Sequence, residues 1–196
     1  MFSVHPLKEL TENKNKHLVF VHTPKCGGSY VSKILEHLKI TNKGHEQAIL
    51  NDDYIYFTII RNPVERFESL LNYRLGEKKP RNDWPKRLSY VYDNKNKNKN
   101  ISLNDIISNM TDKKILGFLP YRTLNYWIKN VDIIITLDNL PKMLEYFGYT
   151  YDVNLFEKVN VSNKIRGKIN QHNKDRLQNI FNDDVNIYNM VINSVF

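Results

Sequence analysis

The chain has 196 residues, 41% of them hydrophobic and 12% aromatic, and at roughly 150 residues per domain this length predicts one domain spanning residues 1–196. Its 29 Lys and Arg residues against 21 Asp and Glu residues give a net charge of +8, which favours an anionic partner such as a nucleotide, a nucleic acid, an acidic glycan or a membrane surface. The single cysteine, Cys26, excludes an internal disulfide, and the six histidines show no metal-binding spacing, so we expect no metal site.

The first part of the chain, residues 1–16, is polar and predicts a loose N-terminal arm. It carries Lys8 and Glu9 where a signal peptide would need an apolar run. No stretch of the sequence approaches the roughly 18 consecutive apolar residues of a membrane helix. We therefore expect a cytoplasmic protein without a membrane span.

Three short apolar runs rich in β-forming residues predict buried strands: His17–His22, Tyr54–Ile60 and Val131–Leu137. An amphipathic pattern follows each run and predicts a helix: Ser29–Leu38 with Ser29 as its N-cap, a helix that begins at Pro63, and Asn139–Phe147. Strands that are apolar on both faces and alternate with helices imply a parallel sheet covered on both sides. The sequence thus predicts an α/β fold of three layers, with a central parallel sheet flanked by helices.

Two further regions complete the chain. Residues 77–100 are rich in Lys and Asn and predict a basic, flexible excursion from the domain. Its cations and Trp84 could form a platform for a glycan, and a solvated loop is the alternative. A last helix, from about Asn173 to Val195, is expected to pack back on the sheet.

A glycine turn, Thr23–Tyr30, follows the first predicted strand. A strand that opens through Gly27 and Gly28 into a helix aims backbone N–H groups at one point, where the helix dipole adds positive potential. Glycine also lets a phosphate approach the backbone more closely than a Cβ would allow. Lys25 supplies a charge, and the Ser29 hydroxyl can donate to a phosphate oxygen. Taken alone, the pattern also fits a tight turn with a surface lysine.

The second predicted strand ends at Arg61, and Ser69 follows eight positions later, two turns into the next helix. Arg61 could form a bidentate pair with a phosphate while Ser69 approaches from the helix flank. Arg66, on the same helix, is open to interpretation as a solvated surface residue. Two such turns in one parallel sheet would hold two separated phosphate groups. A nucleotide with phosphates on its 5′ and 3′ positions fits this pattern better than a nucleoside triphosphate does.

At these residues the chain resembles the carbohydrate sulfotransferases of sulfotransferase family 2, which include the heparan sulfate 2-O- and 6-O-sulfotransferases. Phe20–Tyr30 is similar to their 5′-phosphosulfate loop, His-x-Pro-Lys-Thr-Gly-Gly-Thr/Ser, and Phe57–Ser69 to their 3′-phosphate motif, Arg-Asp/Asn-Pro-x-x-Arg-x-x-Ser. The likeness covers about residues 17–75. It implies a P-loop-NTPase-like fold and, as co-substrate, 3′-phosphoadenosine 5′-phosphosulfate (PAPS), with no metal.

The resemblance also implies binding roles for individual residues. On the 5′ side of the nucleotide these are Lys25, Cys26, Gly27, Gly28, Ser29 and Tyr30, and at the 3′-phosphate they are Arg61 and Ser69. Cys26 replaces the usual Thr and removes a possible hydroxyl contact, and Tyr30 is bulkier than the usual residue. Val159–Arg166 is similar to the family's late Asn-x-Ser-rich loop. Further cofactor-binding candidates are therefore Ser162, Lys164 and Arg166, with an ordinary basic loop as the alternative.

Sulfuryl transfer to a hydroxyl requires a base, a cation beside the leaving phosphate oxygen and an acceptor in line with the breaking bond. Lys25 is the natural cation. For the base, the segment around His45 looks like the His-centred segment of these enzymes, and histidine is the side chain that most often serves as a general base. Glu46 is the rival base, because other sulfotransferases use a glutamate. His22 ends the first strand, where we expect a structural role.

The sequence therefore predicts an enzyme that moves a sulfuryl group from PAPS to a hydroxyl, and we expect a carbohydrate acceptor and no nucleic-acid partner. Two other classes stay open. A nucleotide or small-molecule kinase of the same fold would need GxxxxGK[ST], which is missing here. A basic nucleic-acid-binding module is supported by the net charge alone.

Overall fold

The computed structural model describes residues 16–76, 102–118, 123–152, 154, 156 and 167–194. Most of the predicted arm, the basic excursion at 77–100 and the late loop at 159–166 lie outside the described residues. The chain divides into two compact units: unit 1 comprises Met1–Asn62, Arg122–Val161 and Asn186–Phe196, and unit 2 comprises Pro63–Tyr121 and Ser162–Val185. The single domain that the length predicts stays a prediction.

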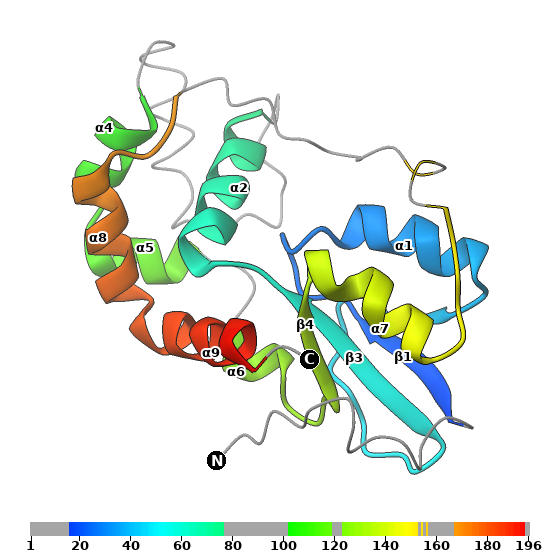
Figure 1. The fold of residues 1–196 in the computed structure, drawn as a ribbon. Coiled ribbons are helices and arrows are strands. Elements are labelled where there is room, and N and C mark those ends of the chain that lie inside the picture. The colour runs from blue at the N-terminus through cyan, green and yellow to red at the C-terminus, as the bar shows by residue number, and fades with distance from the viewer. Residues whose placement is uncertain are drawn as a thin grey trace. The chain divides into compact units, whose positions relative to one another are not determined.

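Unit 1 is built on a four-stranded, all-parallel sheet with the order β2-β1-β3-β4 (Figure 1). The strands are β1 (His17–Val21), β2 (Thr41–Asn42), β3 (Tyr54–Ile60) and β4 (Ile133–Thr136). All three predicted strands are confirmed, although β4 is shorter than predicted. The two-residue β2 was not predicted, because two residues are too few to show a periodicity. In the register, Val21 lies opposite Thr58.

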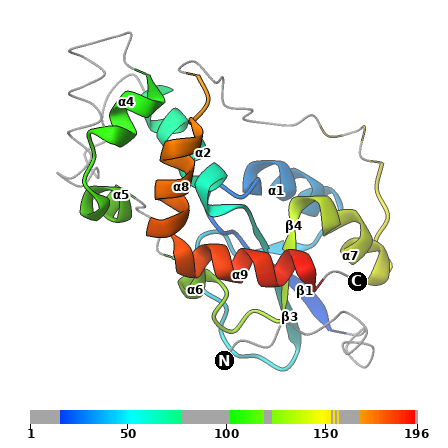
Figure 2. The ribbon, with the colours of Figure 1, turned by 60° about the vertical axis from the view of Figure 1, so that its left-hand side comes forward.

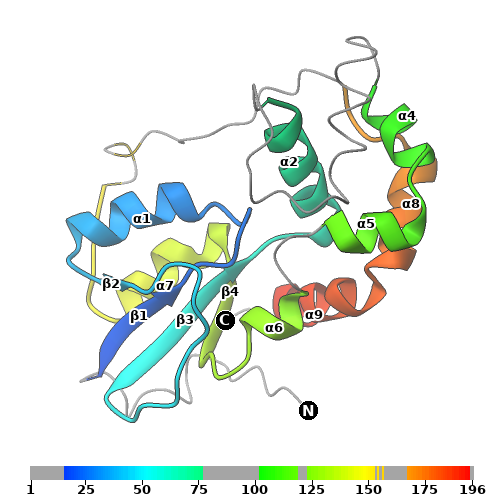
Figure 3. The same cartoon turned by 180° about the vertical axis from the view of Figure 1, so that it is seen from behind.

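Helices flank the sheet on both faces (Figure 2, Figure 3). On one face, α1 (Gly28–His37) and α7 (Leu140–Tyr146) share a core with alternate residues of the strands, among them Phe20 and Phe57. On the other face, Ile60 packs with α6 (Leu124–Trp127) and with Val191 of α9 (Asn182–Asn193). Burial of both sheet faces explains why the strands are apolar throughout. The predicted α/β class, with a parallel sheet and flanking helices, is confirmed.

Unit 2 is helical where it is described. Its elements are α2 (Pro63–Gly76), α4 (Leu103–Ser108), α5 (Asp112–Phe118) and α8 (Gln171–Ile180). They share one apolar core, which includes Phe67, Ile107 and Leu177. Arg66 is buried beside this core with 2% of its surface exposed, and its Nη1 lies 3.8 Å from Oδ2 of the buried Asp184. The interpretation of Arg66 as a solvated residue is therefore wrong.

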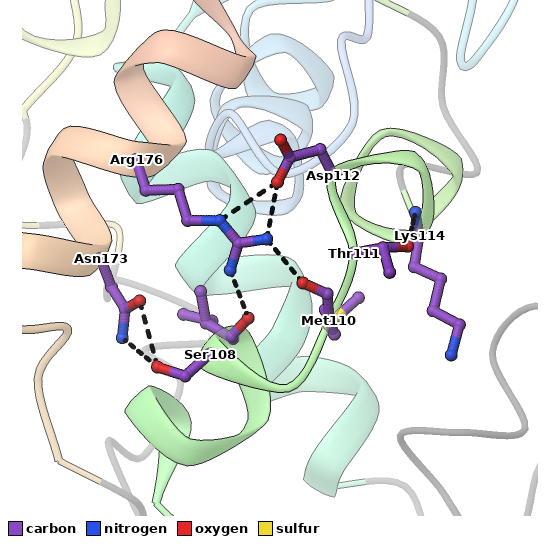
Figure 4. Close-up of polar contacts among 8 residues, drawn as sticks. Ser108, Met110, Thr111, Asp112, Lys114, Asn173 and Arg176 are labelled. Carbon is purple, nitrogen blue, oxygen red and sulfur yellow. Dashed lines mark hydrogen bonds and ion pairs between the residues drawn. The ribbon is translucent and has the colours of Figure 1, made fainter.

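Arg176 connects α8 to the α4–α5 turn (Figure 4). Its guanidinium donates to the carbonyl oxygens of Ile107 at 2.9 Å and Met110 at 2.6 Å, and it pairs with the Asp112 carboxylate at 2.6 Å. The carbonyls at a helix C-terminus have no partner within the helix, so a cation that binds them stabilises the end of α4. Asn173 adds a contact to Ser108 on the same side of α8.

The C-terminal helix departs from the prediction. Instead of one helix over 173–195, the chain forms α8 and α9 with a break at Phe181, whose side chain is buried in the core of unit 2. Val191 of α9 packs beside the sheet as predicted, whereas Leu177 of α8 belongs to unit 2. One amphipathic pattern does not reveal that its two halves are buried in different cores. Among the described residues, no helix has the length and apolar character needed to cross a bilayer.

Candidate functional site

The candidate site lies at the edge of the sheet where β1 and β3 end. These strands are parallel neighbours, so their carboxyl ends meet at one edge, which is where ligands bind in open α/β sheets. Lys25 follows the end of β1 by four residues, and Arg61 directly follows the end of β3. The fold therefore brings the glycine turn and Arg61 to the same edge within unit 1.

A buried hydroxyl pair joins the exits of the two strands. Thr58 Oγ1 donates to the carbonyl oxygen of Val21 at 2.7 Å, which uses its one hydrogen. Thr23 Oγ1, 2.8 Å from Thr58 Oγ1, must therefore be the donor in that second contact. Both threonines are fully buried. The pair holds the start of the glycine turn against β3.

The glycine turn contains two residues in the left-handed region, Lys25 with φ 65° and Gly27 with φ 88°. Gly27 is the N-cap of α1, and its carbonyl accepts hydrogen bonds from Tyr30 and Val31. The prediction that Ser29 caps the helix is wrong: Ser29 is exposed in the first turn, because α1 begins at Gly28. Among the described residues no side chain caps α1. Its first-turn N–H groups are therefore suited to an anion.

Gly28 is required by a contact within the protein. A Cβ at this position would lie 1.6 Å from Nε2 of His22, an impossible distance for two atoms that are not bonded to each other. The His22 ring thus lies against the first turn of α1. The sequence interpretation attributed Gly28 to the close approach of a phosphate, and the structure adds this second, steric reason for a glycine.

His22 and His45 form a pair of imidazoles. Their ring centroids are 4.2 Å apart, and His45 Nδ1 lies 2.8 Å from the backbone carbonyl oxygen of His22. A carbonyl can only accept, so His45 Nδ1 carries the hydrogen. In neutral His45 the lone pair is then on Nε2. His45 is exposed, and this tautomer leaves Nε2 as its basic nitrogen.

Backbone hydrogen bonds hold the segment before His45 along the end of β1. Lys43 N donates to the carbonyl of Phe20, and His22 N donates to the carbonyl of Gly44, each at 2.9 Å. Gly44 N in turn donates to the Asn42 side chain, and Gly44 has a positive φ of 69°. These bonds continue the β1–β2 pairing as far as His45, which explains how a residue 23 positions later reaches His22.

The α6 region supports the segment after His45. Gln47 Nε2 donates to the carbonyl oxygen of Tyr126 at 2.7 Å, and Asn130 donates to the carbonyl of Ala48. The buried Trp127 presents an edge-to-face contact to His45, with ring centroids 6.2 Å apart. His45 is therefore held between β1 and α6.

The electrostatics of this pair are unusual. Burial, with smaller contributions from the charges of His45 and Lys25, lowers the pKa of His22 from 6.5 to about 4. His22 is therefore neutral at pH 7. The contributions of Lys25 and His45 indicate a positive potential at this edge of the sheet, which suits a phosphate or sulfate group.

Three other predicted residues of unit 1 have distinct environments. The Cys26 side chain is buried in the core, with Sγ 3.6 Å from the carbonyl oxygen of Pro24, so its backbone is the part available to a ligand. Tyr30 is half-buried. Burial of the Tyr151 hydroxyl raises the pKa of Tyr151, and the neighbouring Tyr30 raises it further by a smaller amount. Glu46, the rival base, is 74% exposed and lies 3.9 Å from Lys43 Nζ.

The remaining predicted residues lie outside unit 1 or outside the described residues. Ser69 lies on α2 and belongs to unit 2, whereas Arg61 belongs to unit 1. The late-loop candidates are outside the described residues: Ser162, Lys164 and Arg166. Their roles at the nucleotide stay predictions.

The sequence interpretation missed several residues that shape the edge: Thr23, Asn42, Thr58 and Trp127. A Thr within an otherwise apolar strand, such as Thr58, is a usable signal for a buried hydroxyl contact. Asn42 two residues before Gly44 is typical of an Asx turn. Trp127 offered no comparable signal, because it lies 82 residues after His45 in the chain.

A cavity of about 570 Å³ lies in unit 2, between α5 and α8, and its lining includes Asp112, Asp175 and Arg176. None of the predicted site residues that the structure describes lines it. Its arginine is paired with Asp112 and backbone carbonyls, and its acidic residues suit an anion poorly. In the described part of the chain, no group of three or more His, Cys, Asp or Glu side chains could hold a metal ion.

The fold and the site define an α/β protein with an all-parallel sheet and a candidate anion site at its carboxyl edge. Comparisons with protein-family models, curated proteins and solved structures give no match for this chain. The assignment of a function therefore depends on the residues themselves.

Proposed function

We propose that this protein is a sulfotransferase that moves the sulfuryl group of PAPS to a hydroxyl, with carbohydrates as the acceptor class, on a P-loop-NTPase-like fold. The observation that carries the proposal is the gathering of three features at one edge of one sheet: the Lys25 glycine turn, Arg61 and the fixed tautomer of His45. A cation at each of two strand ends supports a ligand with two separated phosphates.

The residues at this edge fit a phosphate group. α1 has no side-chain cap among the described residues, and Ser29 is exposed in its first turn. Lys25 adds a positive charge, which is the smallest of the three causes, after burial and the charge of His45, that lower the pKa of His22. Lys25, Ser29 and the first turn of α1 would hold the 5′ side of the nucleotide, and Arg61 would hold the 3′-phosphate.

The donor, when bound, supplies the sulfuryl group and a phosphate leaving group. His45 would accept the proton of the acceptor hydroxyl at Nε2 while the acceptor oxygen bonds to sulfur. Lys25 would offset the charge on the phosphate oxygen that keeps the electron pair of the broken S–O bond. Arg61 would fix the far end of the nucleotide, so that the reacting atoms stay in line.

The first test is the choice of nucleotide. We expect calorimetry to show that 3′-phosphoadenosine 5′-phosphate binds at least about 10-fold more tightly than ATP, a difference of about 1.4 kcal/mol. Lys25→Ala and Arg61→Ala should each weaken binding by about 10- to 100-fold, the loss of one charge-assisted contact. Lys33→Ala, an exposed lysine of α1, is the matched control and should leave the affinity unchanged. Preference for ATP would contradict the proposal.

The second test is transfer itself. With a radiolabelled sulfate donor and a panel of carbohydrate and other hydroxyl acceptors, the wild type should label at least one acceptor. His45→Ala should lower the rate by about 10²- to 10⁴-fold, the usual contribution of a general base. Glu46→Gln should retain the rate, and its loss instead would make Glu46 the base.

A further inference from the structure

His22 has no role in the proposed chemistry, yet two of its contacts are with His45. Its carbonyl oxygen accepts from His45 Nδ1 at 2.8 Å, and its ring lies 4.2 Å from the His45 ring, centroid to centroid. The sequence predicted only a structural role for this residue.

We infer that His22 is the positioning residue of His45: its carbonyl and its imidazole together hold the His45 ring in the orientation and tautomer in which Nε2 is the basic nitrogen. This inference rests on the proposed function, in which His45 is the base. A half-turn of the His45 ring would replace Nδ1 by a carbon at the His22 carbonyl and lose the hydrogen bond. The His22 imidazole and Trp127 pack against the His45 ring and hinder this rotation.

The His22 ring is itself held in place. It stacks on Phe20 with centroids 5.8 Å apart and an interplanar angle of 22°. On another side it fills the space that the missing Cβ of Gly28 leaves at the first turn of α1. The His22 ring therefore contacts the core of unit 1, the glycine turn and His45. A displaced glycine turn would move His22 and, with it, the proposed base.

The charge state of His22 agrees with this role. Its lowered pKa, about 4, keeps the His22 ring neutral at pH 7. A neutral neighbour packs against His45 without repelling the proton that His45 gains. Among the described residues, His45 and Lys25 are the titratable groups whose charges act on His22.

The experiment compares wild type, His22→Ala and His22→Asn, with His172→Ala, an exposed histidine of unit 2, as the matched control. Transfer kinetics give kcat and the donor KM, and ¹⁵N NMR of the imidazoles gives the His45 tautomer. We expect His22→Ala to lower kcat by about 10- to 100-fold, the usual effect of a misplaced reacting group, with the donor KM within about 2-fold. His45 should change from the Nδ1–H form to a mixture of tautomers. His22→Asn keeps a planar polar group, so it should restore part of kcat and part of the Nδ1–H form of His45.

Unchanged kcat and an unchanged His45 tautomer in folded His22→Ala would overturn the inference, and if that variant does not fold, His22→Asn decides by the same readouts. A failure of the proposed function looks different: the wild type neither binds 3′-phosphoadenosine 5′-phosphate nor transfers sulfate. The NMR comparison still decides in that case. His22→Ala keeps the backbone carbonyl and removes the imidazole. Loss of the Nδ1–H form therefore supports the joint role of carbonyl and imidazole, whereas its retention shows that the carbonyl alone fixes the tautomer and overturns the role inferred for the His22 ring.

Discussion

The ring of His22 occupies the place where Gly28 lacks a side chain, and a Cβ at Gly28 would lie 1.6 Å from His22 Nε2. The two glycines of the turn therefore have separate causes. Gly27 adopts a left-handed backbone with φ 88°, whereas Gly28 makes room for an imidazole. A sequence motif shows both positions only as glycine and does not distinguish these two causes.

Gly28→Ala should destabilise the protein through this overlap. We expect a loss of about 1–3 kcal/mol in the free energy of unfolding, the usual cost of overpacking a filled site. In a His22→Ala background the same substitution should cost close to nothing, because the space is then empty. Urea unfolding of the four proteins in this double-mutant cycle gives the coupling energy.

Gly148→Ala is the control for that cycle. Gly148 has φ 82° and no atom within 4 Å of a Cβ, so its cost comes from the left-handed backbone alone, about 1–2 kcal/mol. That cost should be the same with and without His22. A coupling energy near zero for Gly28 would show that the two residues do not compete for space.

The stability of the protein should depend on pH through His22. Its pKa is 6.5 in the unfolded chain and about 4 in the folded protein, so between these values the unfolded chain binds the extra proton. The stabilisation is complete above pH 6.5 and is lost as the pH falls toward 4. We expect this loss to be about 1–2 kcal/mol after allowance for solvent screening of the partly exposed ring.

Unfolding in urea at pH 7 and pH 4.5 measures that loss. His22→Asn lacks the titrating group and should lose less stability over this interval than the wild type, whereas His172→Asn should follow the wild type. An equal loss of unfolding free energy between pH 7 and pH 4.5 in the wild type and in His22→Asn would refute the assigned pKa of His22.

Arg66 and Asp184 form a buried ion pair in unit 2, with both side chains less than 5% exposed. Arg66→Met should cost about 3–5 kcal/mol, because it removes one partner of a buried ion pair and leaves the carboxylate charge buried. The double variant Arg66→Met/Asp184→Leu should recover most of that loss, since it removes both charges. Thermal unfolding of the three variants checks this, and equal losses for the single and double variants would contradict it.

Arg176 stabilises unit 2 mainly through the carbonyl oxygens of Ile107 and Met110. Arg176→Ala should cost about 1.5–3 kcal/mol, the range for hydrogen bonds to a charged group. Asp112→Ala should cost less than about 1 kcal/mol, because the Asp112 side chain is 64% exposed. Arg176→Lys should not restore stability, since one ammonium lacks the fork that reaches these acceptors together. Denaturant unfolding ranks the three variants, and a larger loss for Asp112→Ala would reverse this account.

Much of the architecture was predictable from local patterns. The apolar run Tyr54–Ile60 and the Pro63 start of α2 match the structure residue for residue, and Gly148 follows α7 as a C-terminal glycine should. The short α4, α5 and α6 were not predicted, because no predicted strand leads directly into any of them, as one leads into α7, which is as short as α5. The break at Phe181 was missed because the residues before it and after it both have a helical pattern.

The sequence by itself determined the strands, the longer helices and the polar turns that end β1 and β3, because these depend on residues that are neighbours in the chain. Tertiary structure alone decided that His45 donates to the carbonyl of His22, that Gly28 accommodates an imidazole and that Arg66 is buried beside Asp184. Each of these contacts joins residues that are distant in the chain or depends on how a ring is packed. Such contacts arise from the packing of side chains in space, and no periodicity along the chain encodes them.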